Sequence, residues 1–125
     1  MTVYKSSSCG CCTDWVTHME GAGFAVTVKE TDDTDKIAKD LGVPAAGLSC
    51  HVGVVNGYIV EGHVPADAVQ KVLKEKPAIL GLTVPGMPQS APGMYRPGGP
   101  KEPYTIMAID KAGKMSVYQK REGGA

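Results

Sequence analysis

Three cysteines lie within four residues near the N-terminus, at Cys9, Cys11 and Cys12, and no other feature of the sequence constrains the fold as strongly. The residues just before them, Val3–Lys5, have the character of a short buried strand. The residues after them place apolar side chains on one face of a helix, at Trp15, Val16 and Met19. The sequence therefore predicts a strand, a tight turn that carries the sulfur atoms, and a helix over about residues 12–20.

The fourth cysteine, Cys50, is far from the others in sequence and is followed directly by His51. Structural disulfides explain this arrangement poorly, because a C-x-C-C cluster closes no long loop and its adjacent cysteines do not easily pair. Clustered thiols are more typical of metal or redox chemistry. We expect the fold to bring Cys50 and His51 to the tip of the first helix, where they complete a thiolate-rich metal site.

Strands and helices alternate after this first helix. Strands are predicted over residues 24–29, 50–55 and 58–60, and Asn56-Gly57 predicts a two-residue type I′ turn between the last two. Helices are predicted from apolar spacing at Ile37, Ala38 and Leu41 and, after Pro65, at Ala68, Val69, Val72 and Leu73. The order β-α-β-α-β-β-α is that of a thioredoxin-like domain of mixed α/β (α+β) class, which we assign to residues 1–84.

The last third of the chain differs in composition. Residues 85–103 are rich in proline and glycine and include Met87 and Met94, so this segment is longer than an ordinary connection and cannot be a core helix. We expect it to form a loop that packs on the same domain. Residues 104–110 and 115–119 alternate in polarity on either side of a turn, which predicts a C-terminal β-hairpin over residues 104–121.

The charge balance argues against some classes of partner. The 125 residues include 13 basic and 13 acidic side chains, so no basic excess indicates nucleic acid or an anionic membrane surface. No apolar run approaches the roughly 20 residues that cross a bilayer as a helix. Lys5 and the serines after it stand where a signal peptide would have its apolar region, so no signal peptide is visible.

Cys9 and Cys12 have the C-x-x-C spacing of a thiol redox centre, and a helix N-terminus beside them favours the thiolate. A thiolate is both a nucleophile and a metal ligand, so two functions compete for these residues. Cys11 favours metal binding, because an oxidoreductase does not need a third thiol that invites wrong pairing. Cys50-His51 also favours metal binding, because redox members of the thioredoxin-like fold usually have a cis-proline at that place.

The expected ligands are soft donors, which suit Cu(I), Zn(II) or an iron–sulfur cluster. Zinc requires a closed tetrahedron of four ligands, and the adjacent Cys11 and Cys12 would rarely both reach one ion. Cu(I) accepts two or three ligands and bridging thiolates, so crowded sulfur atoms can hold several Cu(I) ions together. Met87 and Met94 would add thioether ligands if residues 85–103 folded over the site as a lid.

A series of motifs in the same order resembles the CopG family of copper-resistance proteins. The motifs are the C-x-C-C cluster with Trp15, His18 and Gly23-Phe24, then Leu41-Gly42-Val43-Pro44, Ser49-Cys50-His51, Gly57-Tyr58, Glu61-Gly62-His63-Val64-Pro65-Ala66, Gly81-Leu82, Val84-Pro85-Gly86-Met87-Pro88 and Pro92-Gly93-Met94. The resemblance covers residues 3–94. The hairpin expected over residues 104–121 lies outside it.

This resemblance implies a periplasmic protein that binds a small cluster of Cu(I) ions, with the redox state of the cysteines coupled to metal loading. By position it implies Cys9, Cys11, Cys12 and Cys50 as metal ligands, with His51 beside them. A periplasmic location requires that a signal peptide has been removed. Another periplasmic copper protein is then an expected partner, in addition to the copper ions.

We therefore expect a protein that sequesters, buffers or transfers Cu(I) in copper resistance, and a binding protein rather than an enzyme. A thiol-disulfide oxidoreductase using Cys9 and Cys12, with a link to copper, is the main alternative, and an iron–sulfur thioredoxin-like ferredoxin is a third. His63 is expected to be structural, whereas His18 is assigned either to a half-exposed helix position or to a role behind the metal ligands. Trp15 is expected to pack beneath the thiol turn.

Overall fold

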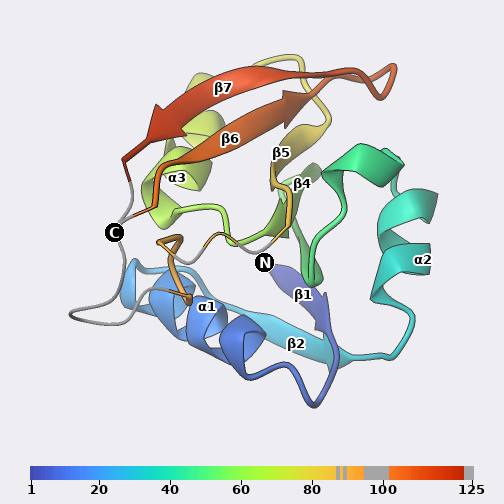
Figure 1. Cartoon of the computed structure of the whole chain (residues 1–125), viewed down its shortest axis with the longest axis vertical. Coiled ribbons are helices and arrows are strands. Elements are labelled where there is room, and N and C mark those ends of the chain that lie inside the picture. The colour runs from blue at the N-terminus through green and yellow to red at the C-terminus, as the bar shows by residue number, and fades with distance from the viewer. Residues whose placement is uncertain (87, 89, 95–101, 123–125) are drawn as a thin grey trace.

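The structure is a computed structural model that describes residues 1–86, 88, 90–94 and 102–122 (Figure 1). Its strands are β1 (Thr2–Lys5), β2 (Thr27–Glu30), β3 (His51–Val55), β4 (Tyr58–Gly62), β5 (Gly81–Val84), β6 (Tyr104–Ile109) and β7 (Met115–Arg121). Its helices are α1 (Gly10–Gly21), α2 (Thr34–Asp40) and α3 (Ala66–Glu75), with a 3-10 turn at Ala45–Gly47. Within the described ranges, no helix has the length and apolar character needed to span a membrane.

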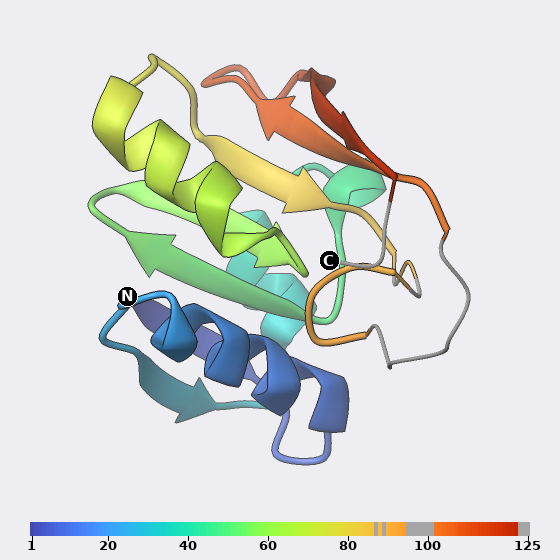
Figure 2. The same cartoon turned by 90° about the vertical axis from the view of Figure 1, so that its left-hand side faces the viewer.

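The strands form one mixed sheet in the order β2-β1-β3-β4-β5-β6-β7. β1 and β2 are parallel and are joined through α1, whereas β3 and β4 form an antiparallel hairpin. Asn56 and Gly57 connect this hairpin with positive φ angles of 49° and 83°, as a type I′ turn requires. Figure 2 shows α1 and α3 in front of the sheet and α2 behind it. The predicted α+β thioredoxin-like fold is confirmed.

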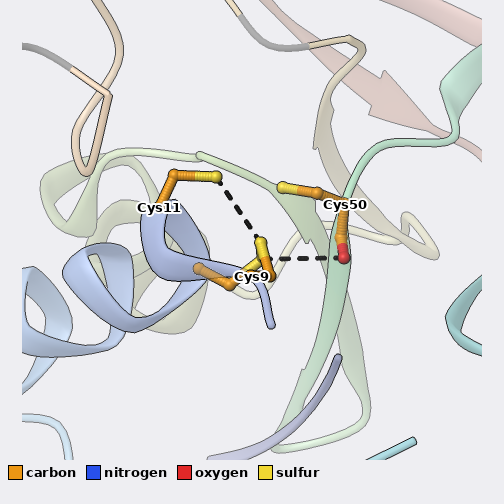
Figure 3. Close-up of side chains that lie close together, drawn as sticks. Cys9, Cys11 and Cys50 are labelled. Carbon is orange, nitrogen blue, oxygen red and sulfur yellow. Dashed lines mark hydrogen bonds between the residues drawn. A yellow bond between two sulfur atoms is a disulfide. The ribbon is translucent and has the colours of Figure 1, made fainter. Parts of the chain in front are cut away.

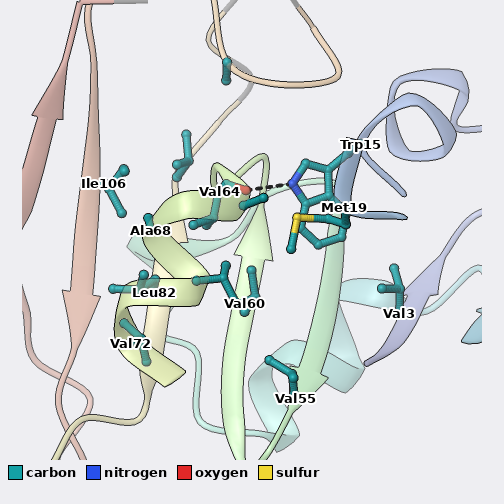
Figure 4. Close-up of a cluster of buried hydrophobic side chains, with 14 of the residues drawn as sticks. Val3, Trp15, Met19, Val55, Val60, Val64, Ala68, Val72, Leu82 and Ile106 are labelled. Carbon is teal, nitrogen blue, oxygen red and sulfur yellow. Dashed lines mark hydrogen bonds between the residues drawn. The ribbon is translucent and has the colours of Figure 1, made fainter. Parts of the chain in front are cut away.

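Apolar stripes on the helices cover both faces of the sheet. On one face, α1 and α3 pack their buried side chains onto the central strands (Figure 4), through Trp15, Met19, Val60, Val69, Val72 and Leu82. On the other face, α2 contributes to a smaller cluster, formed by Ala38, Val43, Val52, Ile59 and Ile109. Burial of one such large side chain stabilises the fold by roughly 1.5–3 kcal/mol, so α1 is held firmly against the sheet.

The second strand begins later than the sequence predicts. Alternation from Phe24 predicts a strand over residues 24–29, whereas β2 begins at Thr27. The reason is that β1 begins at Thr2, which lies opposite Thr27, so no partner strand extends to Phe24 and Val26. These two side chains pack against the core from outside the strand, and β2 itself is an exposed edge strand.

The sequence pattern contains no indication of β5, which the structure adds to the predicted order. Its four residues are all buried, so they show no alternation of apolar and polar side chains. The strand is also shorter than a typical one. β5 pairs in parallel with β4 and antiparallel with β6. It therefore joins the central strands to the β6–β7 hairpin within one sheet.

Three chain segments meet at the end of the sheet where the cysteines lie. Lys5, the last residue of β1, pairs with His51, the first residue of β3. β4 ends next to them at Gly62, and α1 begins at Gly10 after a short loop from β1. The N-terminus of α1 therefore lies at the same end of the sheet as the residues that precede β3 and follow β4.

Candidate metal centre

The cysteine turn forms the start of α1 (Figure 3). Cys9 is the N-cap residue, and Cys12 is buried in the first turn of the helix. A disulfide joins Cys9 to Cys12, whereas Cys11 is a free thiol whose sulfur lies 3.5 Å from the sulfur of Cys9. The backbone N–H of Cys9 donates to the carbonyl of Ser6 at 3.2 Å, and this bond closes the loop that leads into the turn.

Cys50 lies beside this turn, as the sequence predicts. Its sulfur and the sulfur atoms of Cys9, Cys11 and Cys12 all lie within 4.8 Å of one another. Figure 3 shows the side chains of Cys11 and Cys50 pointing toward each other, Cys11 from α1 and Cys50 from the residue just before β3. The sulfur of Cys12 also lies 3.7 Å from the carbonyl oxygen of Cys50. The fold thus gathers all four cysteines into one group with the spacing of metal ligands.

His51 is fully buried beside Cys50. Its Nδ1 lies 3.3 Å from the sulfur of Cys50, and its ring packs on that of Trp15 with 4.3 Å between the ring centroids. Burial lowers the pKa of His51 to about 3, so its imidazole is neutral near pH 7 and has a lone pair for a metal. Its Nε2 has no hydrogen-bond partner among the described residues.

His63 belongs to the same group, although its position in the sequence predicts a structural role. Its Nε2 lies 3.2 Å from the sulfur of Cys50, and its Nδ1 lies 2.7 Å from the carbonyl oxygen of Pro92. A carbonyl oxygen only accepts hydrogen bonds, so Nδ1 carries the proton and the lone pair of Nε2 points at the sulfur. Burial also lowers the pKa of His63, which keeps the ring neutral.

One signal in the sequence could have identified His63. A two-residue turn at Asn56-Gly57 sets Val55 opposite Tyr58, and the same register carried outward sets Cys50 opposite His63. Cross-strand neighbours of this kind have their side chains within contact distance. The location of His63 shortly before Pro65, in a turn, favours a structural role only when this register is left out of account.

The pKa of the Cys50 thiol is strongly shifted. Burial raises its pKa to about 12, an effect that the hydroxyl of Ser49 opposes and that Cys11 adds to. Without a metal, the thiol therefore keeps its proton near pH 7. A bound cation would take the place of that proton, because a thiolate needs a positive partner in this buried position.

A segment after β5 covers the site, and we name residues 90–94 the cover segment. Ser90 and Ala91 are fully buried, and Pro92 holds His63 as described above. Gly93 has a φ of +88°, and a Cβ there would lie within 3.0 Å of the backbone of α1 and of the imidazole of His63. Met94 follows directly and is half-buried. Met87, the other methionine expected at the site, lies outside the described residues.

His18 and Glu61 lie near the site without joining it. The Nε2 of His18 accepts the backbone N–H of Ala66 at 3.1 Å, so this imidazole holds the start of α3 against α1. The carboxylate of Glu61 accepts the backbone N–H of Ser49 at 2.7 Å. Glu61 pairs with Val52 and so points to the α2 face, away from the thiols.

Comparison with known proteins places this arrangement in a family. Residues 48–94 match a family model described as protein of unknown function DUF411. Two solved structures entitled copper resistance protein CopG, form 2 and form 1, each share 40% sequence identity and a TM-score of 0.89 with this chain. The alignments cover 96% and 98% of this chain and 95% and 96% of those chains. This chain belongs to the CopG family of copper-resistance proteins. None of the curated proteins matches it.

Membership of the CopG family confirms the resemblance found in the sequence. The family match at residues 48–94 includes Cys50, His51 and His63, and it extends through the cover segment. The structural likeness extends over nearly the whole chain, including the β6–β7 hairpin that lies outside the sequence resemblance. The hairpin is thus part of the shared architecture and not an addition in this protein.

Proposed function

We propose that this protein binds copper, as Cu(I), in a cluster held by Cys9, Cys11, Cys12 and Cys50 in their reduced form, and that it serves copper resistance. One observation carries the proposal. In a member of the CopG family, four cysteine sulfurs from two distant parts of the chain lie within 4.8 Å of one another.

The chemistry of the donors supports Cu(I) over other metals. Thiolates are soft ligands, and Cu(I) accepts two or three of them and shares them between ions. Cys11 and Cys12 are adjacent in the first turn of α1, so they are suited to neighbouring ions that share sulfur atoms. His51, together with Met94 on the cover segment and Met87, would supply further soft or borderline donors at the edge of such a cluster.

The disulfide supports a link between cysteine redox state and copper loading. Reduction of the Cys9–Cys12 disulfide by two electrons and two protons gives two thiols, which become ligands when metal displaces their protons. Oxidation removes the same two ligands and releases the copper that they hold. We propose that the protein works in this way in the periplasm and exchanges Cu(I) with another copper protein there.

Metal analysis after anaerobic loading tests the function. The reduced chain is mixed with excess Cu(I), freed of unbound metal, and analysed for copper per protein. We expect several equivalents, with a stepwise loss in the single variants Cys9→Ser, Cys11→Ser, Cys12→Ser and Cys50→Ser. Ser8→Ala, in the loop before the turn, is the matched control and should keep the full number. No copper above the level of the Cys50→Ser variant would refute the proposal.

The Cys9–Cys12 disulfide at a helix N-terminus also favours a second candidate, a thiol-disulfide oxidoreductase. The two functions differ in their need for Cys11, because a dithiol exchange uses only Cys9 and Cys12. Reduction of insulin disulfides by the reduced protein, unchanged in Cys11→Ser, would favour the oxidoreductase. Absence of insulin reduction together with copper loading favours the copper-binding function.

A further inference from the structure

We propose that Cys50, His51 and His63 form a separate metal position on the buried side of the cysteine cluster, and that it holds one ion while the Cys9–Cys12 disulfide is closed. The expected ion is a late first-row metal that accepts mixed sulfur and nitrogen ligands, copper or zinc. The inference rests on the proposed metal-binding function and deepens it, because it assigns one part of the site to a different redox state.

The geometry of the three side chains supports such a position. One ligand atom from each lies within 4.8 Å of the others. The sulfur of Cys50 lies 3.2 Å from Nε2 of His63 and 3.3 Å from Nδ1 of His51. A tetrahedral ion with bonds of about 2.3 Å to sulfur and 2.0 Å to nitrogen would hold these atoms about 3.5 Å apart. The two sulfur–nitrogen distances therefore need to change by only a few tenths of an ångström, and the two imidazole nitrogens already lie within 4.8 Å of each other.

His63 is already oriented as a metal ligand. The carbonyl of Pro92 accepts the proton of Nδ1, so Nε2 presents its lone pair to Cys50 without a change of tautomer. A backbone carbonyl or carboxylate behind a ligating imidazole is the usual second contact of protein metal sites, where it fixes the ring and raises its basicity. The ion would replace the thiol proton that lies between Cys50 and His63.

His51 is the weaker of the two imidazole ligands. The single thiol proton of Cys50 is directed to His63, so Nδ1 of His51 donates its own proton toward the sulfur. Ligation through Nδ1 moves this proton to Nε2, which has no acceptor among the described residues. An unpartnered buried N–H is unfavourable, so His51 contributes less affinity than His63.

This position does not depend on the disulfide. Oxidation removes Cys9 and Cys12 as ligands, whereas Cys50 remains a free thiol and both histidines keep their places in the structure with the disulfide closed. Two imidazoles and one thiolate suit copper in both oxidation states and also Zn(II). Oxidation therefore lowers the number of bound ions and does not empty the site.

Titration of the oxidised full-length protein with Co(II) tests the proposal. Co(II) is a visible probe for sites of this ligand class, and alkylation with mass analysis first verifies that Cys9 and Cys12 are paired. We expect one equivalent of Co(II), a thiolate-to-metal absorption band, displacement of Co(II) by Zn(II), and slower alkylation of Cys50. Failure of the oxidised wild-type protein to bind Co(II), or binding without a thiolate band, overturns the inference whatever the variants do.

Single variants identify the ligands. Cys50→Ser and His63→Gln should each weaken Co(II) binding at least 10-fold, and His51→Gln should weaken it less than His63→Gln. His18→Gln is the matched control, because it changes the third histidine in the same way and lies outside the group; it should bind as the wild type does. Co(II) binding that survives His63→Gln overturns the inference.

Cu(I) loading of the reduced wild-type protein, run in parallel, separates this inference from the proposed function. Several equivalents of Cu(I) in the reduced protein, with no ion in the oxidised protein, overturn only the inference. Absence of metal from both forms overturns both.

Discussion

The imidazole Nε2 of His63 lies 3.2 Å from the sulfur of Cys50 across the β3–β4 hairpin. The register of this hairpin favours the contact, because it pairs Val55 with Tyr58 and Val52 with Glu61, and the same offset carried past the strand ends sets Cys50 opposite His63. The contact between two candidate ligands therefore depends on a turn at the opposite end of the hairpin. The turn residues Asn56 and Gly57 lie at the end of the hairpin opposite to the cysteines.

Insertion of one glycine between Asn56 and Gly57 should disrupt the metal site. An inserted residue shifts the pairing of the two strands by one position, so Cys50 would no longer lie opposite His63. We expect loss of the single ion in the oxidised protein and of at least half of the Cu(I) in the reduced protein. Metal analysis after loading measures both.

The matched control is the same insertion in the β6–β7 turn, between Ala112 and Gly113. That hairpin lies at the edge of the sheet and carries none of the candidate ligands. It should lose stability and keep its metal. Equal loss of metal from both insertion variants would show that general destabilisation, and not the β3–β4 register, removes the metal.

Much of the fold follows from the sequence because its signals are local. The strand-turn-helix around Cys9, the Asn56-Gly57 turn and the apolar face of α3 each depend on neighbouring residues, and all are in place. β5 could not be predicted, because a short strand buried on both faces has no periodic pattern. The start of β2 depends on where β1 begins, which is not a property of residues 24–29.

The sequence predicts the placement of Cys50 better than that of His63. The proximity of Cys50 to the thiol turn follows from the thioredoxin-like order of elements, whereas the placement of His63 needs the hairpin register as well. The contact between His63 and Pro92 depends on the course of the cover segment, which is rich in proline and glycine and has no pattern that fixes it. The hydrogen bond that orients His63 is thus harder to predict from the sequence than the position of His63 itself.

Gly93→Ala should displace the cover segment and weaken metal binding. A Cβ at this position would lie 2.8 Å from the backbone nitrogen of Trp15 and 2.9 Å from Nδ1 of His63, and the φ of +88° is strained for alanine. We expect a loss of about 2–4 kcal/mol in the free energy of unfolding from strain and overpacking together. Urea unfolding measures this loss, and Co(II) titration should show weaker binding.

Gly113→Ala provides the control for this prediction. Gly113 has a φ of +85° and open space where the Cβ would be, so only the backbone strain of about 1–2 kcal/mol applies. Metal affinity should be unchanged in this variant. If the two variants lost the same stability and bound metal alike, the cover segment would have no role in holding His63.

Trp15→Phe should lower the free energy of unfolding by about 1–3 kcal/mol. Trp15 is fully buried and donates its Nε1–H to the carbonyl of Val64 at 2.8 Å, so phenylalanine leaves that buried acceptor without its donor. Trp15 is the single tryptophan of the chain, so the variant has no tryptophan fluorescence. Urea unfolding of both proteins is therefore followed by circular dichroism. Unchanged stability would mean that the indole nitrogen contributes nothing beyond ring packing.

Glu61→Gln should reduce the loss of stability that the metal-free, disulfide-closed protein suffers as the pH rises. Burial raises the pKa of Glu61 to about 8 from an ordinary value of 4.5, so the folded state holds a proton that the unfolded chain has released. This contribution is fully present below pH 4.5 and is lost as the pH rises through 8.

Glutamine keeps a carbonyl oxygen for the N–H of Ser49 and has no proton to lose. We measure urea unfolding at several pH values between these two pKa values. The free energy of unfolding of the variant should increase relative to that of the wild type as the pH rises, by at most about 1.4 kcal/mol per pH unit. Parallel curves for the two proteins would contradict the raised pKa.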